Sequence, residues 1–171
     1  MPALPQADLQ VQPLAKHHDK NGFSCGVDSL DRYLKTQAGQ DMQRKANGVF
    51  ILTAVAEPSR IIGYYTLCAT SISQGDVPDE AREHIPRYPL VSATLIGRLA
   101  ISAARQGEGL GEILLTDALQ RAFENTGTVG SSMVIVDALD ERAARFYATH
   151  RFVRFNDTMR LILPMRLAGG G

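Results

Sequence analysis

The segment Gln106–Gly111 places three glycines between a predicted strand and a predicted helix, and it constrains the fold more than any other part of the chain. It reads Gln-Gly-Glu-Gly-Leu-Gly, follows β-like residues at Val91–Ser102 and precedes an amphipathic helical pattern. A strand that turns through glycines into a helix is typical of α/β proteins. The free N–H groups of the first helical turn, together with the helix dipole, favour a phosphate there. Taken alone, the segment is equally consistent with a flexible turn before a helix.

Two common phosphate-binding motifs do not fit this loop. A P-loop requires GxxxxGK[ST], and the glycines are not followed by the required Lys and Ser or Thr. A dinucleotide-binding fingerprint requires GxGxxG, and Glu112 stands where the third glycine belongs. The pattern that remains is Q-x-x-G-x-G, filled by Gln106, Gly109 and Gly111.

The periodicity of the chain predicts one α/β domain, with a mixed central β-sheet flanked by helices on both faces. The predicted strands are Leu9–Gln12, Val49–Ala56, Ile61–Ser73, Val91–Ser102, Met133–Val136, Val153–Phe155 and Met159–Leu163. The predicted helices are Leu30–Met42, Pro78–His84, Leu110–Ala122 and Glu141–His150, with caps at Asp28-Ser29 and Asp140. We expect the domain to span residues 1–171, with a short flexible tail at 168–171.

Length and composition exclude several classes of protein. With 18 basic and 18 acidic residues, a uniformly basic nucleic-acid binder and an acidic disordered chain are both disfavoured. The two cysteines, Cys25 and Cys68, are too few for a disulfide scaffold or a Cys-rich zinc site, and the histidines show no metal-ligand spacing. The start of the chain lacks a signal-peptide pattern, and the apolar stretch Val49–Ala56 is too short to span a bilayer. We therefore expect a reduced, cytoplasmic protein without a metal ion or a membrane partner.

The charges are unevenly placed along the chain. From Arg142 to the end there are six arginines and one acid, Asp157. From Gly107 to Glu141 there are seven acids and one base. Two solvated faces explain this pattern, and so does an arginine-rich surface that meets an anionic partner.

The Q-x-x-G-x-G pattern after Arg98-Leu99-Ala100-Ile101 resembles the coenzyme A loop of the GNAT acetyltransferase superfamily. The resemblance implies that the loop amides hold the pyrophosphate of acetyl-CoA, and that the preceding strand pairs its backbone with the pantetheine arm. The cofactor-binding residues implied in this way are Leu99, Ala100, Ile101, Gln106, Gly107, Glu108, Gly109, Leu110, Gly111 and Glu112.

The segment Asp140–Tyr147, followed by Phe152, resembles the closing helix of the same family. Phe146 falls on the side of Leu139 and Ala143, so we expect it in the core. Tyr147 is rotated from it by about 100° and is expected to face a cleft. A phenol has a proton to donate, and the resemblance implies that Tyr147 is the catalytic acid that protonates the departing thiolate.

Two residues of this helix region depart from the family pattern. Arg151 stands where the family has a glycine, so the local turn must avoid a positive φ or accept strain. Asp140 stands where the family often has an asparagine, and a carboxylate there suits a helix cap.

A larger set of segments from Leu14 to Pro164 makes the chain similar to the tRNA-acetylating toxins of bacterial type II toxin–antitoxin modules. The segments are Phe23–Gly26, Leu30–Leu34, Ile62–Leu67, Pro86–Pro89, Gly97–Ile101 and Val136–Ala138. The resemblance implies acetylation of the α-amine of an aminoacyl-tRNA, which blocks translation. It also implies a ribbon-helix-helix antitoxin and a homodimer.

The arginine-rich C-terminal third supplies candidates for the tRNA contact, and they are Arg142, Arg145, Arg151 and Arg154. Two other functions stay open. One is an acetyltransferase for a small amine or a protein N-terminus, against which the arginines argue. The other is a non-catalytic acyl-CoA-binding regulator, against which Tyr147 argues.

Overall fold

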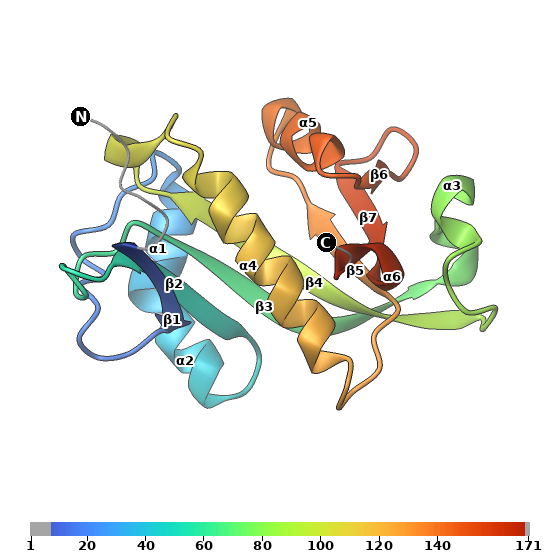
Figure 1. Cartoon of the computed structure of the whole chain (residues 1–171), viewed down its shortest axis with the longest axis horizontal. Helices are drawn as coiled ribbons and strands as arrows, with labels where there is room; N and C mark the ends of the chain where they lie inside the picture. The colour runs from blue at the N-terminus through green and yellow to red at the C-terminus, as the bar shows by residue number, and fades with distance from the viewer. Residues whose placement is uncertain (1–7, 170–171) are drawn as a thin grey trace. The chain divides into compact units, whose positions relative to one another are not determined.

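The computed structural model describes residues 8–169 and contains a seven-stranded mixed sheet in the order β1-β2-β3-β4-β5-β7-β6 (Figure 1). The strands are β1 (Leu9–Pro13), β2 (Gly48–Ala54), β3 (Gly63–Ser73), β4 (Leu90–Ile101), β5 (Met133–Asp137), β6 (Val153–Arg154) and β7 (Arg160–Pro164). The helices are α1 (Asp28–Thr36), α2 (Ala38–Gln43), α3 (Asp79–Arg82), α4 (Leu110–Asn125), α5 (Glu141–Thr149) and α6 (Met165–Ala168). Short 3-10 turns cover Gln74–Asp76 and Ala103–Arg105.

The strand directions confirm the predicted mixed α/β sheet. β4 and β5 run parallel, whereas β1–β2, β2–β3, β5–β7 and β6–β7 pair antiparallel. The chain divides into two compact units, the first formed by the described residues of Met1–Leu67 and Arg98–Asp117 and the second by those of Cys68–Gly97 and Ala118–Gly171. That the whole chain forms a single domain stays a prediction.

In the first unit, helices cover both faces of the sheet. The Tyr64 hydroxyl donates to the carbonyl of Leu30 in α1 at 2.7 Å, and the Tyr65 hydroxyl donates to Asp117 in α4 at 2.6 Å. Neighbouring residues of a strand point to opposite faces, so α1 and α4 lie on opposite sides of β3. The core on the α1 side contains Phe23, Cys25, Tyr33, Leu34, Ala38, Val49, Ile51, Ile61, Tyr64 and Ala100.

In the second unit, β5 lies between β4 and β7, and its side chains are buried on both faces. Ile135 pairs with Ile162 of β7, and both belong to a core that includes Ala81 of α3. The remaining members of this core are Ile72, Val77, Ile85, Val91, Ala93 and Met133. Val134 and Val136, which point to the other face of β5, are also fully buried.

The predicted helix Leu30–Met42 is interrupted in the structure. α1 ends at Thr36 and α2 begins at Ala38, because Gln37 leaves helical geometry with φ −121°. The Thr36 hydroxyl donates back to the Arg32 carbonyl at 2.7 Å, a bond that bends helices. The predicted cap at Asp28-Ser29 is also wrong, since Val27 is the N-cap residue and no side chain caps the helix.

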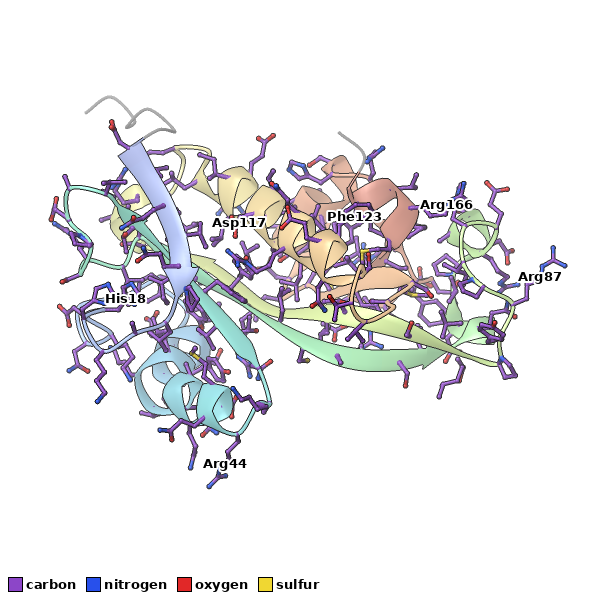
Figure 2. All side chains as sticks on the ribbon, turned by 60° about the horizontal axis from the view of Figure 1, so that its bottom comes forward. His18, Arg44, Arg87, Asp117, Phe123 and Arg166 are labelled. Atoms are coloured by element: carbon purple, nitrogen blue, oxygen red, sulfur yellow. The ribbon has the colours of Figure 1, made fainter. Side chains whose placement is uncertain are left out.

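His17 and His18 lie in a turn rather than in a helix or strand, and their ring centroids are 4.1 Å apart. His18 is buried between β1 and α1 (Figure 2), where its Nδ1 accepts from the Ala15 amide at 2.9 Å.

The C-terminal end differs in part from the predicted tail. α6 continues to Ala168, so the flexible tail expected at 168–171 is wrong at that residue, and residues 170–171 lie outside the described part of the chain. The start of the chain at residues 1–7, to which the signal-peptide argument refers, also lies outside it. In residues 8–169 no helix is long and apolar enough to cross a membrane.

Candidate active site

The glycine-rich loop adopts a backbone that only glycines accept easily. Gly107 and Gly109 have φ of 83° and 77°, in the left-handed region. A Cβ atom built on either residue meets nothing within 4 Å, so this face of the loop opens onto free space. α4 begins directly after Gly109, which confirms the predicted strand–loop–helix order.

The amide groups of this loop are unpaired. Ile113 donates to Gly109 at 3.4 Å, whereas the amides of Gln106–Glu112 donate to no carbonyl or side chain in the described residues. Unpaired amides at the start of a 16-residue helix form a site for an anion. The arrangement therefore fits a pyrophosphate, as the resemblance implied.

The loop is anchored by its own side chains. Gln106 Nε2 donates to the carbonyls of Cys25 and Ile101 at 2.9 and 3.1 Å, so this side chain points into the protein. Arg105 and Glu108 form a half-buried ion pair at 3.0 Å. Leu110 is buried in the core, which leaves only its backbone for a ligand. The loop would thus hold a ligand through its backbone, while its side chains fix its shape.

The end of β4 in the first unit is positioned by β3 rather than by pairing with β5. The pairing of β4 with β5 covers Thr94–Ile96 and stops there, so Leu99–Ile101 are not paired with β5. On the β3 side, a Cβ at Gly63 would lie 2.7 Å from the Ala100 carbonyl oxygen and 2.7 Å from Ile101 Cδ1. Gly63 is therefore required for this close approach, and it is a site-supporting residue that sequence reasoning did not single out.

Cys25 supports the loop and is poorly suited to be a nucleophile. Its carbonyl accepts from Gln106, its amide donates to Asp31 at 2.8 Å, and its side chain is buried. Burial, followed by the hydrogen bond with Asp31, raises the pKa of the Cys25 thiol to about 11. The other cysteine, Cys68, is only half-buried.

Tyr147 lies on α5 in the second unit. Asp140 caps this helix as predicted, since its Oδ1 accepts from the Ala143 amide at 2.9 Å. The expected burial of the Phe-Tyr pair is reversed, because Tyr147 is 7% exposed while Phe146 is half-buried and Leu139 is exposed. The reason is that the Tyr147 ring packs edge-on against both Phe146 and Phe152.

The Tyr147 hydroxyl makes no hydrogen bond with any residue between 8 and 169. Burial raises the pKa of this phenol to about 12, so the group is protonated at neutral pH. A protonated phenol without a hydrogen-bond partner in the described part of the protein has its proton available for donation. The assignment of Tyr147 as a catalytic acid stays a prediction.

Arg151 adopts the strained backbone conformation with a positive φ, one of the two alternatives that the sequence left open. Its φ is 73°, in the region that the family's glycine would occupy without cost. Its guanidinium donates to the carbonyl of Leu167 in α6, and this contact fixes the side chain against the end of the chain.

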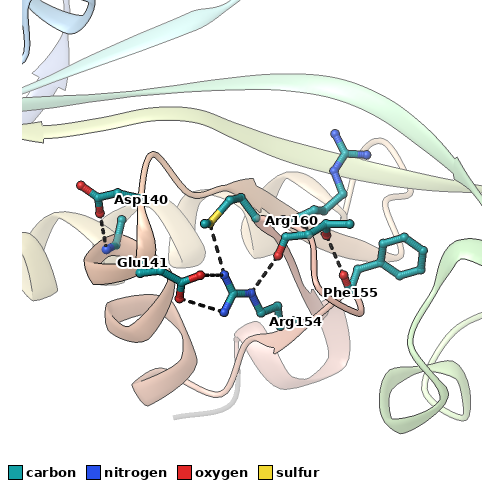
Figure 3. A network of polar contacts seen from close by, with 8 residues as sticks. Asp140, Glu141, Arg154, Phe155 and Arg160 are labelled. Atoms are coloured by element: carbon teal, nitrogen blue, oxygen red, sulfur yellow. Dashed lines mark hydrogen bonds and ion pairs between the residues drawn. The ribbon is translucent and has the colours of Figure 1, made fainter.

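Arg154 is held in an internal network (Figure 3). Its Nη1 and Nη2 donate to the two carboxylate oxygens of Glu141 at 3.0 and 2.7 Å, and its Nε donates to the Thr158 carbonyl at 2.8 Å. The hydrogen bonds from Arg154 lower the pKa of Glu141. Arg142 and Arg145 are exposed and have no hydrogen bond or ion pair within the described part of the chain. The four arginine candidates therefore fall into an engaged pair and an available pair.

The expected site residues thus belong to both units. Leu99–Ile101 and Gln106–Glu112 lie together in the first unit, and Tyr147 and the four arginines lie in the second. Across residues 8–169, no group of three or more His, Cys, Asp or Glu side chains is arranged to hold a metal ion.

A strand that leads through two left-handed glycines into a helix with unpaired amides has the geometry of a backbone site for an anion. The family model described as "Acetyltransferase (GNAT) family" matches residues 23–152. The chain belongs to this family of acetyltransferases.

The similar proteins point to one branch of the family. The chain is 32% identical over 149 residues to a "tRNA-acetylating toxin" of Mycobacterium tuberculosis (strain ATCC 25618 / H37Rv), covering 86% of this chain and 87% of that protein. A structure of AtaT complexed with acetyl-methionyl-tRNAfMet has a TM-score of 0.84 and 27% identity, covering 93% of this chain and 96% of that one. A tyrosine-to-phenylalanine mutant of the AtaT toxin, bound to the C-terminus of the antitoxin AtaR and acetyl-CoA, has a TM-score of 0.78 and 25% identity, with 94% and 96% coverage.

Proposed function

We propose that this protein transfers the acetyl group of acetyl-CoA to the α-amine of an aminoacyl-tRNA and thereby blocks translation. The observation that carries the proposal is the row of unpaired amides at Gln106–Glu112, at the start of α4. The likeness to a tRNA-acetylating toxin, and to AtaT with an acetylated aminoacyl-tRNA, supports the choice of acceptor.

Acetyl-CoA supplies an activated acetyl thioester. The amides of the loop bind its pyrophosphate, and the helix dipole of α4 adds to their attraction. The backbone of Leu99–Ile101 holds the pantetheine arm, and one of its N–H groups polarises the thioester carbonyl. Gly63 keeps β3 close enough to fix this part of β4.

The reaction forms a C–N bond and breaks the C–S bond of the thioester. The attacking amine loses a proton to solvent, and Tyr147 donates a proton to the departing thiolate. A phenol with a pKa of about 12 is a weak acid in water. It can still protonate the departing sulfur, because exclusion from water also favours a neutral thiol over a thiolate.

An α-amine suits a site without a dedicated general base. A free α-amine titrates near about pH 7.7–8.0, and an adjacent ester lowers this pKa further. A large fraction is therefore unprotonated at neutral pH. A lysine ε-amine, with a pKa near about 10.4, would require a base to remove its proton.

The tRNA is bound in part by arginines of the second unit. Arg142 and Arg145 lead, because they are exposed on α5 with unpaired guanidinium groups and lie near Tyr147 in sequence. Arg151 and Arg154 contribute charge, although their hydrogen bonds with Leu167 and Glu141 reduce their freedom to reach a phosphate.

The protein acts in the cytoplasm, as a homodimer, and is neutralised by a ribbon-helix-helix antitoxin. The AtaT toxin bound to the C-terminus of the antitoxin AtaR supports an antitoxin partner. The arginine-rich C-terminal third offers positive charge to an acidic antitoxin segment.

The test is incubation of the protein with total aminoacyl-tRNA and labelled acetyl-CoA. We expect label in the tRNA fraction that is released by mild alkaline hydrolysis as an N-acetyl amino acid. Label on free amines or protein N-termini, with none on tRNA, would identify a small-amine or N-terminal acetyltransferase instead. Binding of acetyl-CoA without any turnover would identify a regulator.

A further inference from the structure

Arg98 in β4 is a half-buried arginine whose hydrogen-bonding groups have no protein partner. Its guanidinium carbon lies 3.5 Å from the centroid of the Tyr33 ring. In the described residues its side chain makes no hydrogen bond and no ion pair. A guanidinium has five N–H donors, and the nitrogens of Arg98 are not sealed from solvent. These donors are therefore available to a ligand.

The aromatic platform under Arg98 is rigidly held. The Tyr33 hydroxyl donates to Asp41 at 2.7 Å, and Asn47 Nδ2 donates to the Tyr33 hydroxyl at 3.3 Å. The Tyr33 ring is stacked on Tyr64, with an interplanar angle of 15°. An arginine stacked on a fixed ring loses little further freedom when it binds a ligand.

The acidic groups on this side of the sheet are already engaged. Asp41 accepts from Gln37, Tyr33 and Asn47, and these hydrogen bonds lower its pKa. Asp31 accepts from the Cys25 amide and the Ser24 hydroxyl. Neither carboxylate forms an ion pair with the guanidinium of Arg98. The negative charge of Asp41 nevertheless reduces the positive potential around Arg98.

The position of Arg98 in the strand places it next to the backbone that is proposed to hold the pantetheine arm. It directly precedes Leu99–Ile101, and a strand rises by about 3.3 Å per residue. Ala100 and Tyr64 belong to the core on the α1 side. Side chains alternate along a strand, so Arg98 points to that same side.

We propose that Arg98 binds the phosphodiester nearest to the aminoacyl ester of the acceptor and so places the amine before the thioester. This inference rests on the proposed function. An aminoacyl ester has no free carboxylate, so the nearest anion is the phosphate of the terminal nucleotide. A planar guanidinium binds two phosphate oxygens at once, and an ammonium does not. The role differs from that of Arg142 and Arg145, which lie in the other unit.

The test compares Arg98→Gln and Arg98→Lys on two acceptors, an aminoacyl-tRNA and a small ester of the same amino acid. We expect Arg98→Gln to raise KM for the aminoacyl-tRNA about 10- to 100-fold, as for a lost hydrogen bond to a charged group. Its kcat/KM on the phosphate-free ester and its KM for acetyl-CoA stay within about twofold, since that is well below the loss of one such bond. Arg98→Lys retains the positive charge but cannot bind two phosphate oxygens at once, so its KM for the aminoacyl-tRNA should lie between those of the wild type and Arg98→Gln. The salt dependence of the tRNA reaction, as log kcat/KM against log salt, becomes shallower by about 0.7 for one lost single-strand phosphate contact.

Arg44→Gln is the matched control, because Arg44 lies at the end of α2 and its exposed side chain extends into solvent (Figure 2). Equal losses on both acceptors would overturn the proposal and make Arg98 a support for β4. Unchanged kinetics on the tRNA would overturn it too. If Arg98→Gln does not fold, Arg98→Lys provides the test: a loss on the aminoacyl-tRNA that exceeds the loss on the small ester supports the proposal, and equal losses overturn it. If the wild-type protein does not acetylate aminoacyl-tRNA at all, the proposed function fails first.

Discussion

The loop Gln106–Glu112 and the end of α5 are built in opposite ways. The loop presents backbone amides, while its side chains Gln106 and Leu110 point into the protein. The end of α5 presents the hydroxyl of Tyr147, whose ring packs against the rings of Phe146 and Phe152. A site made of backbone is sensitive to an added side chain, whereas a site made of one side chain is sensitive to the loss of a single atom.

Loss of the Tyr147 hydroxyl is expected to have the largest effect. Tyr147→Phe keeps the ring packing and removes only the donor, so kcat should fall by about 100- to 10,000-fold. Calorimetric affinity for acetyl-CoA and the melting temperature should stay unchanged. Tyr88→Phe, which alters a 67% exposed ring, is the matched control. A rate for Tyr147→Phe within about twofold of wild type would make Tyr147 a packing residue.

Addition of a charged side chain to the loop comes next. Gly109→Asp puts a carboxylate where the pyrophosphate is expected, and two such charges about 4 Å apart repel by a few kcal/mol at the protein surface. Calorimetry should show acetyl-CoA affinity reduced on the order of 100-fold. Gly130→Asp is the control, since a Cβ there also meets nothing within 4 Å and its φ is ordinary. Unchanged affinity in a folded Gly109→Asp variant would remove the site from this loop.

Substitution of the arginines is expected to have a smaller effect on activity than the two changes above. Arg142→Ala with Arg145→Ala should reduce kcat/KM on aminoacyl-tRNA about tenfold and make its salt dependence shallower, because counterion release follows the number of phosphate contacts. Arg154→Ala breaks the exposed ion pair with Glu141, so it should lower the melting temperature only slightly and change the salt dependence little. An equal change in salt dependence from both variants would show that the internal network leaves Arg154 free to bind tRNA.

The smallest effect concerns stability in alkali. The pKa of Cys25 is raised from 9.0 to about 11, and the pKa values of Tyr33 and Tyr147 are raised from 10.0 to about 12, each mainly by burial. The folded protein therefore binds more protons than the unfolded chain above pH 9, and stability falls as pH rises. Melting temperatures should decline between about pH 9 and 12, and Cys25→Ala should delay the onset. A melting temperature that stays constant up to pH 12 would contradict these shifts.

Local signals in the sequence determined most of the fold. The alternating pattern of apolar residues predicted every strand of the sheet. Asp140 predicted the start of α5, because its side chain caps the helix through a hydrogen bond to the amide of Ala143, three residues away. The loop was predictable for the same reason, since glycines with φ of 83° and 77° and an emerging helix are local features. Such conformational preferences depend on a few neighbouring residues, so they can be inferred from the sequence.

Contacts between distant residues were decided only by the tertiary structure. The helix predicted over Leu30–Met42 breaks at Gln37, Tyr147 rather than Phe146 is the buried ring, and Gln106 reaches the Cys25 carbonyl 81 residues away. Arg154 pairs with Glu141 and Arg98 stacks on Tyr33, which decides which arginines remain available. The sequence by itself determined the elements and the loop that meets the cosubstrate. Packing across the sheet decided the burial and the partners of the side chains, because these depend on which elements become neighbours.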